Sequence, residues 1–313
     1  MDGSNGSNTA LAHAGFTGQF AGGSRRLYST ARAATLRCMN TCPQADFDAD
    51  LARMSPGRAA SIGFRTGKRG THTSRTIMLE EISQLMGAVP GNATLTEYAN
   101  AVIDGNCLSK RTNANRGISL QHLKELYALD ADVLLFRVFR DTWANHATSR
   151  PLLALLLSLA RDPLLRTTAS TIIPLTAGDE LTRQPVNDAV AKNVGGRLNE
   201  STLDKVVRNA LSSWTQSGHL SGWSRKIRQS VAATPAAAAF ALLVAYGTGR
   251  RGQRLFGSPW VAVLDTNPAH LLELARDAKR LGLLELKQSG SMVEVSFPNA
   301  LTPHDQRFMH EPH

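Results

Sequence analysis

The sequence is poor in the residues that build disulfide frameworks and metal centres. Its 313 residues contain three cysteines, too few for a disulfide framework, so we expect a reducing cytoplasm. Cys38 and Cys42 lie close together, but no histidine stands near them, and we expect no metal site there. The nine histidines are scattered, and no pair has the i, i+4 spacing with a glutamate that a catalytic zinc helix needs.

The sequence also lacks a long hydrophobic run. Its most apolar segment, 152–160, ends at Arg161 after nine residues, whereas a membrane-spanning helix needs about 20. We therefore expect a core helix there and no membrane partner. A phosphate-binding loop is absent around Lys68, because isoleucine stands at 62 in place of the leading glycine and arginine at 69 in place of serine or threonine.

The segment 247–252, GTGRRG, matches the dinucleotide-binding fingerprint in its letters but not in its context. The fingerprint needs a strand before it and a helix after it. Here an alanine-rich helix former precedes it, and 256–259 prevent a long helix afterwards. We interpret it as the end of a helix whose basic residues complement the helix dipole. Because no catalytic constellation is present either, we expect a protein that is not an enzyme and uses no cofactor.

Positive charge is the first thing that the sequence has in excess. Lysine and arginine number 35 against 25 acidic residues, a net charge of +10, which fits a polyanionic partner such as DNA, RNA or an acidic membrane surface.

One acid-free, glycine-rich segment, 55–75, carries Arg58, Arg65, Lys68, Arg69 and Arg75. We call it the arm. It could follow a phosphate backbone, or its charges could simply be solvated.

A second positive feature is a pattern that occurs twice, an amphipathic helix that ends at a glycine and continues into a short β-hairpin. The clearer copy spans 268–298 and has its glycine at Gly282. The other spans 199–228, with Gly218 in the same place. A helix followed by a hairpin wing is how a winged helix ends, and winged helices are helix-turn-helix variants. The sequence therefore predicts two winged-helix units, although any α+β domain can contain a helix and a hairpin.

A third candidate element lies in the N-terminal half, where we expect helices at 73–86, 96–104 and 112–129. The start of the last one is rich in arginine and asparagine. These side chains pair with guanine and adenine edges, and recognition helices read bases from their N-terminal end. The segment 94–129 is therefore a helix-turn-helix candidate, with a surface helix that has a polar start as the alternative.

The candidate DNA-contact residues come from these helices and from one wing. They are Lys110, Arg111, Asn115 and Arg116 at the third helix, Lys205 and Arg208 on the helix at 201–217, and Arg225, Lys226 and Arg228 in the wing that follows it.

The expected fold is mostly α, a helical N-terminal domain with helix-turn-helix character followed by winged-helix units with short hairpin wings. Residues 1–54 contain turn-forming runs at 2–8 and 22–24 and no periodicity, and we expect a disordered tail or a mis-assigned start with Met54 as the true first residue. A transit peptide around 24–32 is the alternative. Packed structure should begin near Thr73. The expected divisions are 1–54, 55–178 with buried segments 133–143 and 151–160, 179–230, 231–300 and a tail at 301–313.

The order of residues over 60–230 resembles the BrxA proteins of BREX phage-defence systems. Glu80-Glu81 stands on an early helix, and the segment 104–112, DGNCLSKRT, opens the next. An apolar pair of helices follows, and 199–207, NESTLDKVV, then leads to 216–220, QSGHL. The resemblance implies a small, helical, winged-helix DNA-binding accessory protein that acts beside a methyltransferase and large ATPases.

Two segments depart from that resemblance, the N-terminal tail and the extra unit at 231–300. We expect a non-enzymatic protein that binds double-stranded DNA in the cytoplasm of a bacterium as part of phage defence. A winged-helix transcription regulator is one alternative and would bind a palindromic site as a dimer. A protein adaptor whose wings dock partners is the other, and it would show no salt-dependent affinity for DNA.

Overall fold

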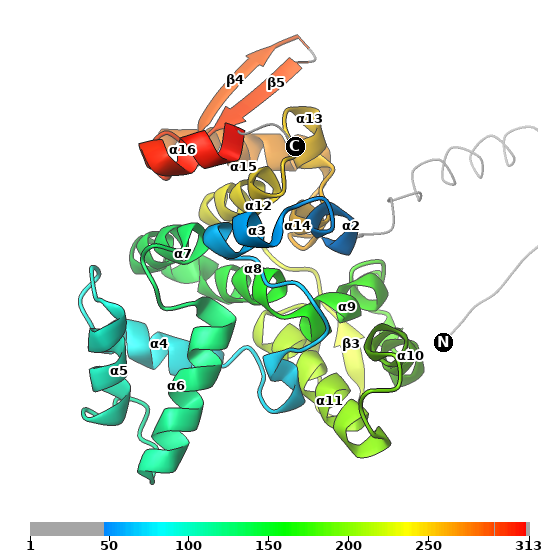
Figure 1. Ribbon diagram of the computed structural model, residues 1–313. Coiled ribbons are helices and arrows are strands. Elements are labelled where there is room, and N and C mark those ends of the chain that lie inside the picture. Colours follow the sequence, from blue (N-terminus) through cyan, green and yellow to red (C-terminus); the bar gives the residue numbers. More distant parts are fainter. Residues whose placement is uncertain (1–46, 291, 311–313) are drawn as a thin grey trace, which may run out of the picture. The chain divides into compact units, whose positions relative to one another are not determined.

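Two short helices open the part of the chain that the computed structural model describes, residues 47–290 and 292–310 (Figure 1). Helix α2 (Phe47–Leu51) and helix α3 (Pro56–Ile62) are both packed. Phe47 and Leu51 are buried, and the Phe47 ring meets Trp260 edge-on with centroids 4.7 Å apart. The expected tail is therefore wrong for 47–54. The two apolar residues of α2 stand four positions apart with acidic residues between them, and so short a pattern gave no clear sign of a helix. The rest of that expectation, with Cys38, Cys42 and 24–32, lies outside the described residues.

The candidate helix-turn-helix forms a layer of helices on one side of the unit. Its elements are α5 (Leu95–Ile103) and α6 (Asn113–Tyr127), and the 3₁₀ turn η1 (Thr71–Thr73) and α4 (Leu79–Ala88) precede them. A capping box between Thr94 and Glu97 starts α5. The helix expected at 73–86 begins only at Leu79, because Met78 adopts a left-handed conformation with φ of 52°.

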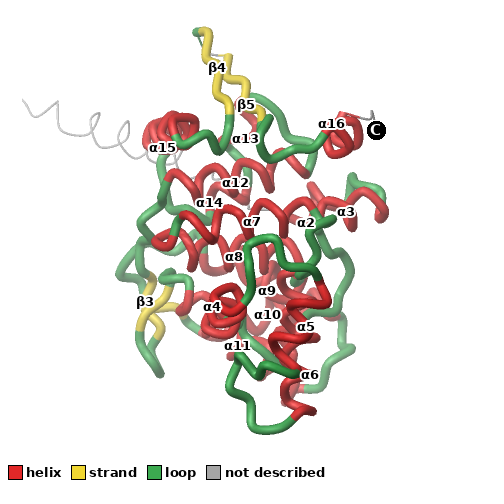
Figure 2. Tube along the Cα trace, turned by 90° about the vertical axis from the view of Figure 1, so that its left-hand side faces the viewer, coloured by secondary structure: helices red, strands yellow, loops and turns green. Residues whose placement is uncertain are grey.

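The core lies in the middle of the chain, where α7 (Leu134–Asn145), the 3₁₀ turn η2 (Ala147–Ser149), α8 (Arg150–Arg161) and α9 (Pro163–Ile172) follow one another. Every residue of α8 from Leu152 to Ala160 is buried, which confirms the core helix expected there. Figure 2 shows α12, α7 and α8 crossing the centre of the unit one below the other. Among the described residues, no helix is long and apolar enough to cross a membrane.

The first winged-helix unit follows directly. It contains β1 (Glu180–Leu181), α10 (Arg183–Val194), α11 (Glu200–Gln216), β2 (Leu220–Ser221) and β3 (Lys226–Arg228). The strands pair antiparallel in the order β1-β3-β2, which is the sheet order of a winged helix. The Asn199 side chain caps α11, and Val206, Ala210 and Trp214 lie on its buried stripe. The helix and wing predicted at 199–228 are confirmed.

The second helix-and-wing copy is joined to the core by a helix that is buried on all sides. Its elements are α12 (Pro235–Gly247), α13 (Gln253–Phe256), α14 (Pro259–Ala262), α15 (Pro268–Arg280), β4 (Glu285–Ser289) and β5 (Met292–Ser296). Strands β4 and β5 pair as an antiparallel hairpin and project from the end opposite the one where α6 and α11 begin (Figures 1 and 2). Helix α12 ends at Gly247, and Arg251 donates to the Tyr246 carbonyl at 2.7 Å, as the interpretation of GTGRRG predicted.

All of these elements belong to one unit, Gln44–His313. The boundaries expected near 178 and 230 fall inside it, and α9 packs on α10 while α12 packs on α8. The expected tail at 301–313 is wrong for its first part, since α16 (Pro303–His310) is helical and Leu301 and Met309 are buried. The domain prediction failed to anticipate this packing because contacts between distant segments leave no local mark in a sequence.

Candidate nucleic-acid interface

The exposed face of α11 carries the two residues predicted there. Lys205 and Arg208 are exposed and line a groove between α10 and the start of α11. Asp204 lines the same groove, with Arg183 Nη2 2.6 Å from its Oδ1 and Arg208 Nη1 4.0 Å from its Oδ2. Because the Arg183 contact is much the shorter, Arg183 rather than Arg208 is the main partner of this carboxylate.

The wing between β2 and β3 is a tight and braced turn. Gly222 has φ of +90°, and a Cβ there would overlap the Arg225 carbonyl oxygen, so the turn requires glycine. Lys226 Nζ donates to the Gly222 carbonyl at 2.6 Å and to Thr215 Oγ1 at 3.0 Å, and burial lowers the pKa of Lys226. Two of its three donor positions are therefore used inside the protein.

Arg225 is exposed but paired with an acid on the first strand. Its Nε lies 3.1 Å from Glu180 Oε1, and its Nη2 contacts Glu180 Oε2. The side-chain hydrogen bond lowers the pKa of Glu180 and raises that of Arg225. This pair ties the wing to β1, so Arg225 contributes less net positive charge than the sequence suggests.

Arg228 is not a surface residue, and its prediction as a DNA contact is wrong. Its side chain is 3% exposed, forms an ion pair with Asp265 and donates to the Ile172 carbonyl at 3.2 Å. Alternation along β3 turns this position inward, opposite Leu220 of β2. The guanidinium therefore joins the first winged-helix unit to the segment before α15.

The four candidates at α6 divide into two pairs. Lys110 Nζ lies 3.1 Å from Glu81 Oε1, and Arg116 Nη1 donates to the Ile103 carbonyl at 2.7 Å. These two hold the turn between α5 and α6. Arg111 and Asn115 are exposed. In Figure 1 helices α6 and α11 both begin at the lower end of the unit, so their N-terminal ends point the same way.

A cluster of basic residues lies where the arm meets the turn between α10 and α11, and only its two arm residues were predicted as candidates for a phosphate backbone. Arg197 Nη2 donates to the Lys68 carbonyl at 2.8 Å, and Lys68 Nζ reaches Gly195 of that turn. We call Lys68, Arg69, Lys192 and Arg197 the arm–turn cluster. All four are exposed, and none has an ion pair within 47–290 and 292–310. The acid-free arm and the sequence Gly195-Gly196-Arg197 were the available signals, but nothing local shows that they meet.

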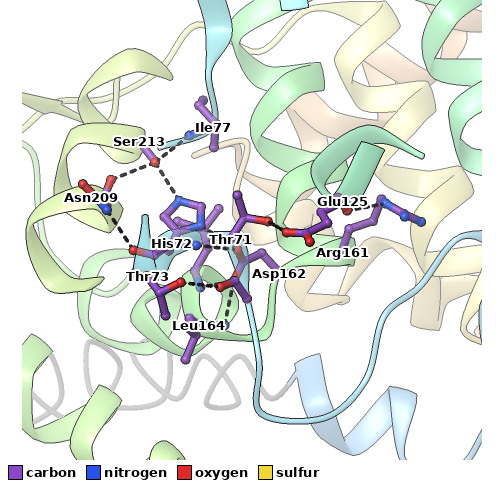
Figure 3. A network of polar contacts seen from close by, with 12 residues as sticks. Thr71, His72, Thr73, Ile77, Glu125, Arg161, Asp162, Leu164, Asn209 and Ser213 are labelled. Atoms are coloured by element: carbon purple, nitrogen blue, oxygen red, sulfur yellow. Dashed lines mark hydrogen bonds and ion pairs between the residues drawn. The ribbon is translucent and has the colours of Figure 1, made fainter. Parts of the chain in front are cut away.

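A buried polar network fixes the arm to the winged helix (Figure 3). His72 Nδ1 lies 2.8 Å from Asp162 Oδ2, and Nε2 lies 2.8 Å from Ser213 Oγ of α11. The Asn209 side chain also donates to the His72 carbonyl at 2.9 Å. All three of His72, Asp162 and Ser213 are at most 1% exposed. We call these three residues the His72 latch.

Asp162 serves two elements at once. Its Oδ1 accepts from Leu164 N and Leu165 N at the start of α9, while Oδ2 accepts from both His72 N and Nδ1. Burial by itself would raise the pKa of Asp162, but the neighbouring His72 and these hydrogen bonds lower it below its ordinary value. A Cβ at Gly70 would overlap the carboxylate, so only glycine allows this approach.

The His72 latch has the composition of a Ser-His-Asp triad, but its geometry is that of a structural clamp. Ser213 Oγ is also within 3.0 Å of Ile77 N and donates to the Asn209 carbonyl at 2.9 Å. These contacts fill the space around the hydroxyl, and a substrate has no position beside it. The network holds η1 between α9 and α11.

The fold and the exposed face thus define a mostly α protein with a small three-stranded sheet after α11 and a basic segment clamped beside that helix. No protein-family model matches the chain, and no curated protein resembles it significantly. In the part of the chain that the structure describes, no group of three or more His, Cys, Asp or Glu side chains could hold a metal ion.

Proposed function

We propose that the protein binds double-stranded DNA through the first winged-helix unit, with the arm along a phosphate backbone. The observation that carries the proposal is the arm–turn cluster, four exposed basic residues without an acidic partner in the described ranges. They stand beside the start of α11, the helix that precedes the wing, and in helix-turn-helix proteins the recognition helix enters the major groove with its N-terminal residues at the bases. Phosphates flanking that groove would then lie within reach of the cluster.

Exposed residues on α11 and α6 fit separate roles in DNA binding. Lys205 and Arg208 stand on the solvent face of α11. Releasing Arg208 from Asp204 would cost little, because exposed ion pairs contribute about 0–1 kcal/mol. Arg111 and Asn115 at the start of α6 provide side chains of the type that reads guanine and adenine.

The resemblance to BrxA proteins extends the proposal to a role in BREX-type phage defence, in the bacterial cytoplasm and beside a methyltransferase and ATPases. An accessory protein of this kind would bind duplex DNA with little sequence preference. A transcription regulator would instead bind as a dimer to a palindromic site. Affinity for random-sequence duplexes distinguishes the accessory protein from the transcription regulator.

The β4–β5 wing favours a second candidate function, the docking of a protein partner. Its charges are balanced, because Lys287 lies opposite Glu294 in the hairpin and Glu285 Oε2 lies 3.1 Å from Nζ of Lys279 on α15. Met292 near its tip is 73% exposed. A neutral wing with an exposed apolar side chain suits a protein surface better than a phosphate backbone.

A salt titration tests the main proposal. The full-length protein is titrated into a labelled random duplex at about 50 mM and about 200 mM salt. We expect micromolar affinity at the lower salt and a steep linear fall of log K with log salt, because each neutralised phosphate releases counterions. Absence of binding at 50 mM, or binding that does not respond to salt, would refute DNA binding and favour the adaptor.

A further inference from the structure

The tip of the first wing displays a tryptophan almost completely to solvent. Trp223 is 96% exposed, whereas the other three tryptophans of the chain, Trp143, Trp214 and Trp260, are at most 3% exposed. Exposing a whole indole to water is unfavourable, so its place at the apex of a wing calls for an explanation.

The turn holds this side chain outward in a defined position. Gly222 before it adopts the positive φ that the turn requires, and the Lys226 ammonium closes the turn on the Gly222 carbonyl at 2.6 Å. The pair of Arg225 with Glu180 anchors the far side of the turn to β1. Since the turn is already ordered, a ligand of Trp223 does not have to order it on binding.

The surroundings of Trp223 favour a nucleobase over an apolar protein surface. Contiguous exposed apolar patches mark protein-binding surfaces, but the neighbouring residues on this wing are serine, glycine, arginine and lysine. The other large hydrophobic side chains exposed in the described ranges are Leu95, Ile118, Leu281 and Met292, and none of them belongs to the first winged-helix unit. An isolated aromatic ring beside basic residues, here Lys226 and the Glu180-paired Arg225, is the combination that stacks on bases near the phosphates.

We propose that Trp223 stacks on a base, or wedges into a base step, of the DNA held by the first winged-helix unit. The preferred ligand is then DNA with a locally unpaired base, such as a bulge or a mismatch. Unstacking costs least where pairing is already lost, so a wedge gains most at such sites. This inference rests on the proposed DNA binding and adds to it a preference for distorted DNA.

The test compares a perfect duplex with the same duplex carrying a single-base bulge, using full-length protein. We expect the bulged duplex to bind about tenfold more tightly, in line with the effect of one base–aromatic stack. Since three of the four tryptophans are buried, acrylamide quenching of intrinsic fluorescence reports mainly on Trp223. We expect the bulged duplex to protect it from the quencher.

Three variants make the result specific. Trp223→Ala should bind the perfect duplex nearly as well as the wild type and lose the preference for the bulge, whereas Trp223→Phe should keep most of it. Met292→Ala, which removes the exposed side chain of the other wing, is the matched control and should behave as the wild type. Circular dichroism should show the same fold in all three, because both side chains are exposed.

Different outcomes overturn the two proposals. An unchanged ratio of affinities in Trp223→Ala, or a loss of affinity that is equal for both duplexes, would refute base stacking while DNA binding stands. The same conclusion follows if acrylamide reaches Trp223 equally in the free protein and the complex. If the wild type binds neither duplex at low salt, the proposed function itself fails.

Discussion

His219 shows how one buried side chain can set the pH response of the fold. It lies just after α11, against the Trp214 ring, with Nε2 donating to the Val263 carbonyl at 2.7 Å and Nδ1 2.9 Å from Ser217 Oγ. Burial lowers the pKa of His219 from 6.5 to about 4. The neutral imidazole is therefore the form that fits the folded protein.

The stability of the protein should fall as the pH falls from about 6.5 to about 4. In this window the unfolded chain protonates His219 and the folded chain does not, so protons favour unfolding. The depressed pKa corresponds to roughly 3 kcal/mol at most, to be measured as the free energy of unfolding in urea at several pH values. His219→Gln, which keeps a donor for Val263, should flatten this part of the profile. His270 is exposed, and His270→Gln is the control. If the free energy of unfolding falls equally steeply with pH in both variants, the prediction is contradicted.

At the scale of elements, the arm–turn cluster should carry a separable share of DNA affinity. Lys68→Ala with Arg69→Ala should reduce the slope of log K against log salt by up to about 0.9 for each lost phosphate contact. The matched control removes two exposed basic residues of the second unit, Arg254→Ala with Lys287→Ala. Fluorescence anisotropy on one random duplex measures both. If the two double variants give the same slope, the arm does not follow the backbone.

Elements with a strong local pattern were predictable from the sequence, and elements defined by pairing were not. The apolar stripe of α11 and the stop at Gly218 predicted that helix and its wing. Strand β1 has two residues, too few to show any periodicity, so the third strand of the sheet was missed. Arg228 was misplaced because a shift of one residue along a strand reverses the face of every side chain.

The site was predictable only in part, because its parts meet over long distances in the sequence. Lys205, Arg208, Arg111 and Asn115 are exposed as expected. The His72 latch joins residues that are 90 and 141 positions apart, and no local pattern marks such a contact. Trp223 stood in the predicted wing, but its near-complete exposure depends on the geometry of the turn.

At the scale of the whole molecule, α2 connects the start of the described chain with its C-terminal half. Phe47 packs on Trp260, and Asp50 pairs with Arg250, with Arg250 Nε 2.6 Å from Asp50 Oδ2. Burying an aromatic or aliphatic side chain of this size contributes about 1.5–3 kcal/mol. This helix therefore belongs to the fold and not to a removable extension.

Two truncated chains test that conclusion. A chain that starts at Ser55 lacks α2, while a chain that starts at Gln44 keeps it. We expect the Ser55 chain to melt several degrees below the Gln44 chain. In a protein of this size, a loss of a few kcal/mol of unfolding free energy lowers Tm by several degrees. Differential scanning calorimetry on both chains gives the comparison. Equal melting temperatures would mean that the contacts of α2 add nothing to stability.

The part of the arm between Arg65 and His72 is fastened at both of its ends, which makes it a strap rather than a free extension. Arg65 N donates to the Ala160 carbonyl at 3.1 Å and the Arg65 carbonyl accepts from Arg166 Nη2, while the His72 latch holds the other end. A loose basic tail would have to give up its conformational freedom on a polyanion. A strap has already lost that freedom during folding, so under the proposed function the four charges of the arm–turn cluster would meet the phosphates at a spacing fixed before binding.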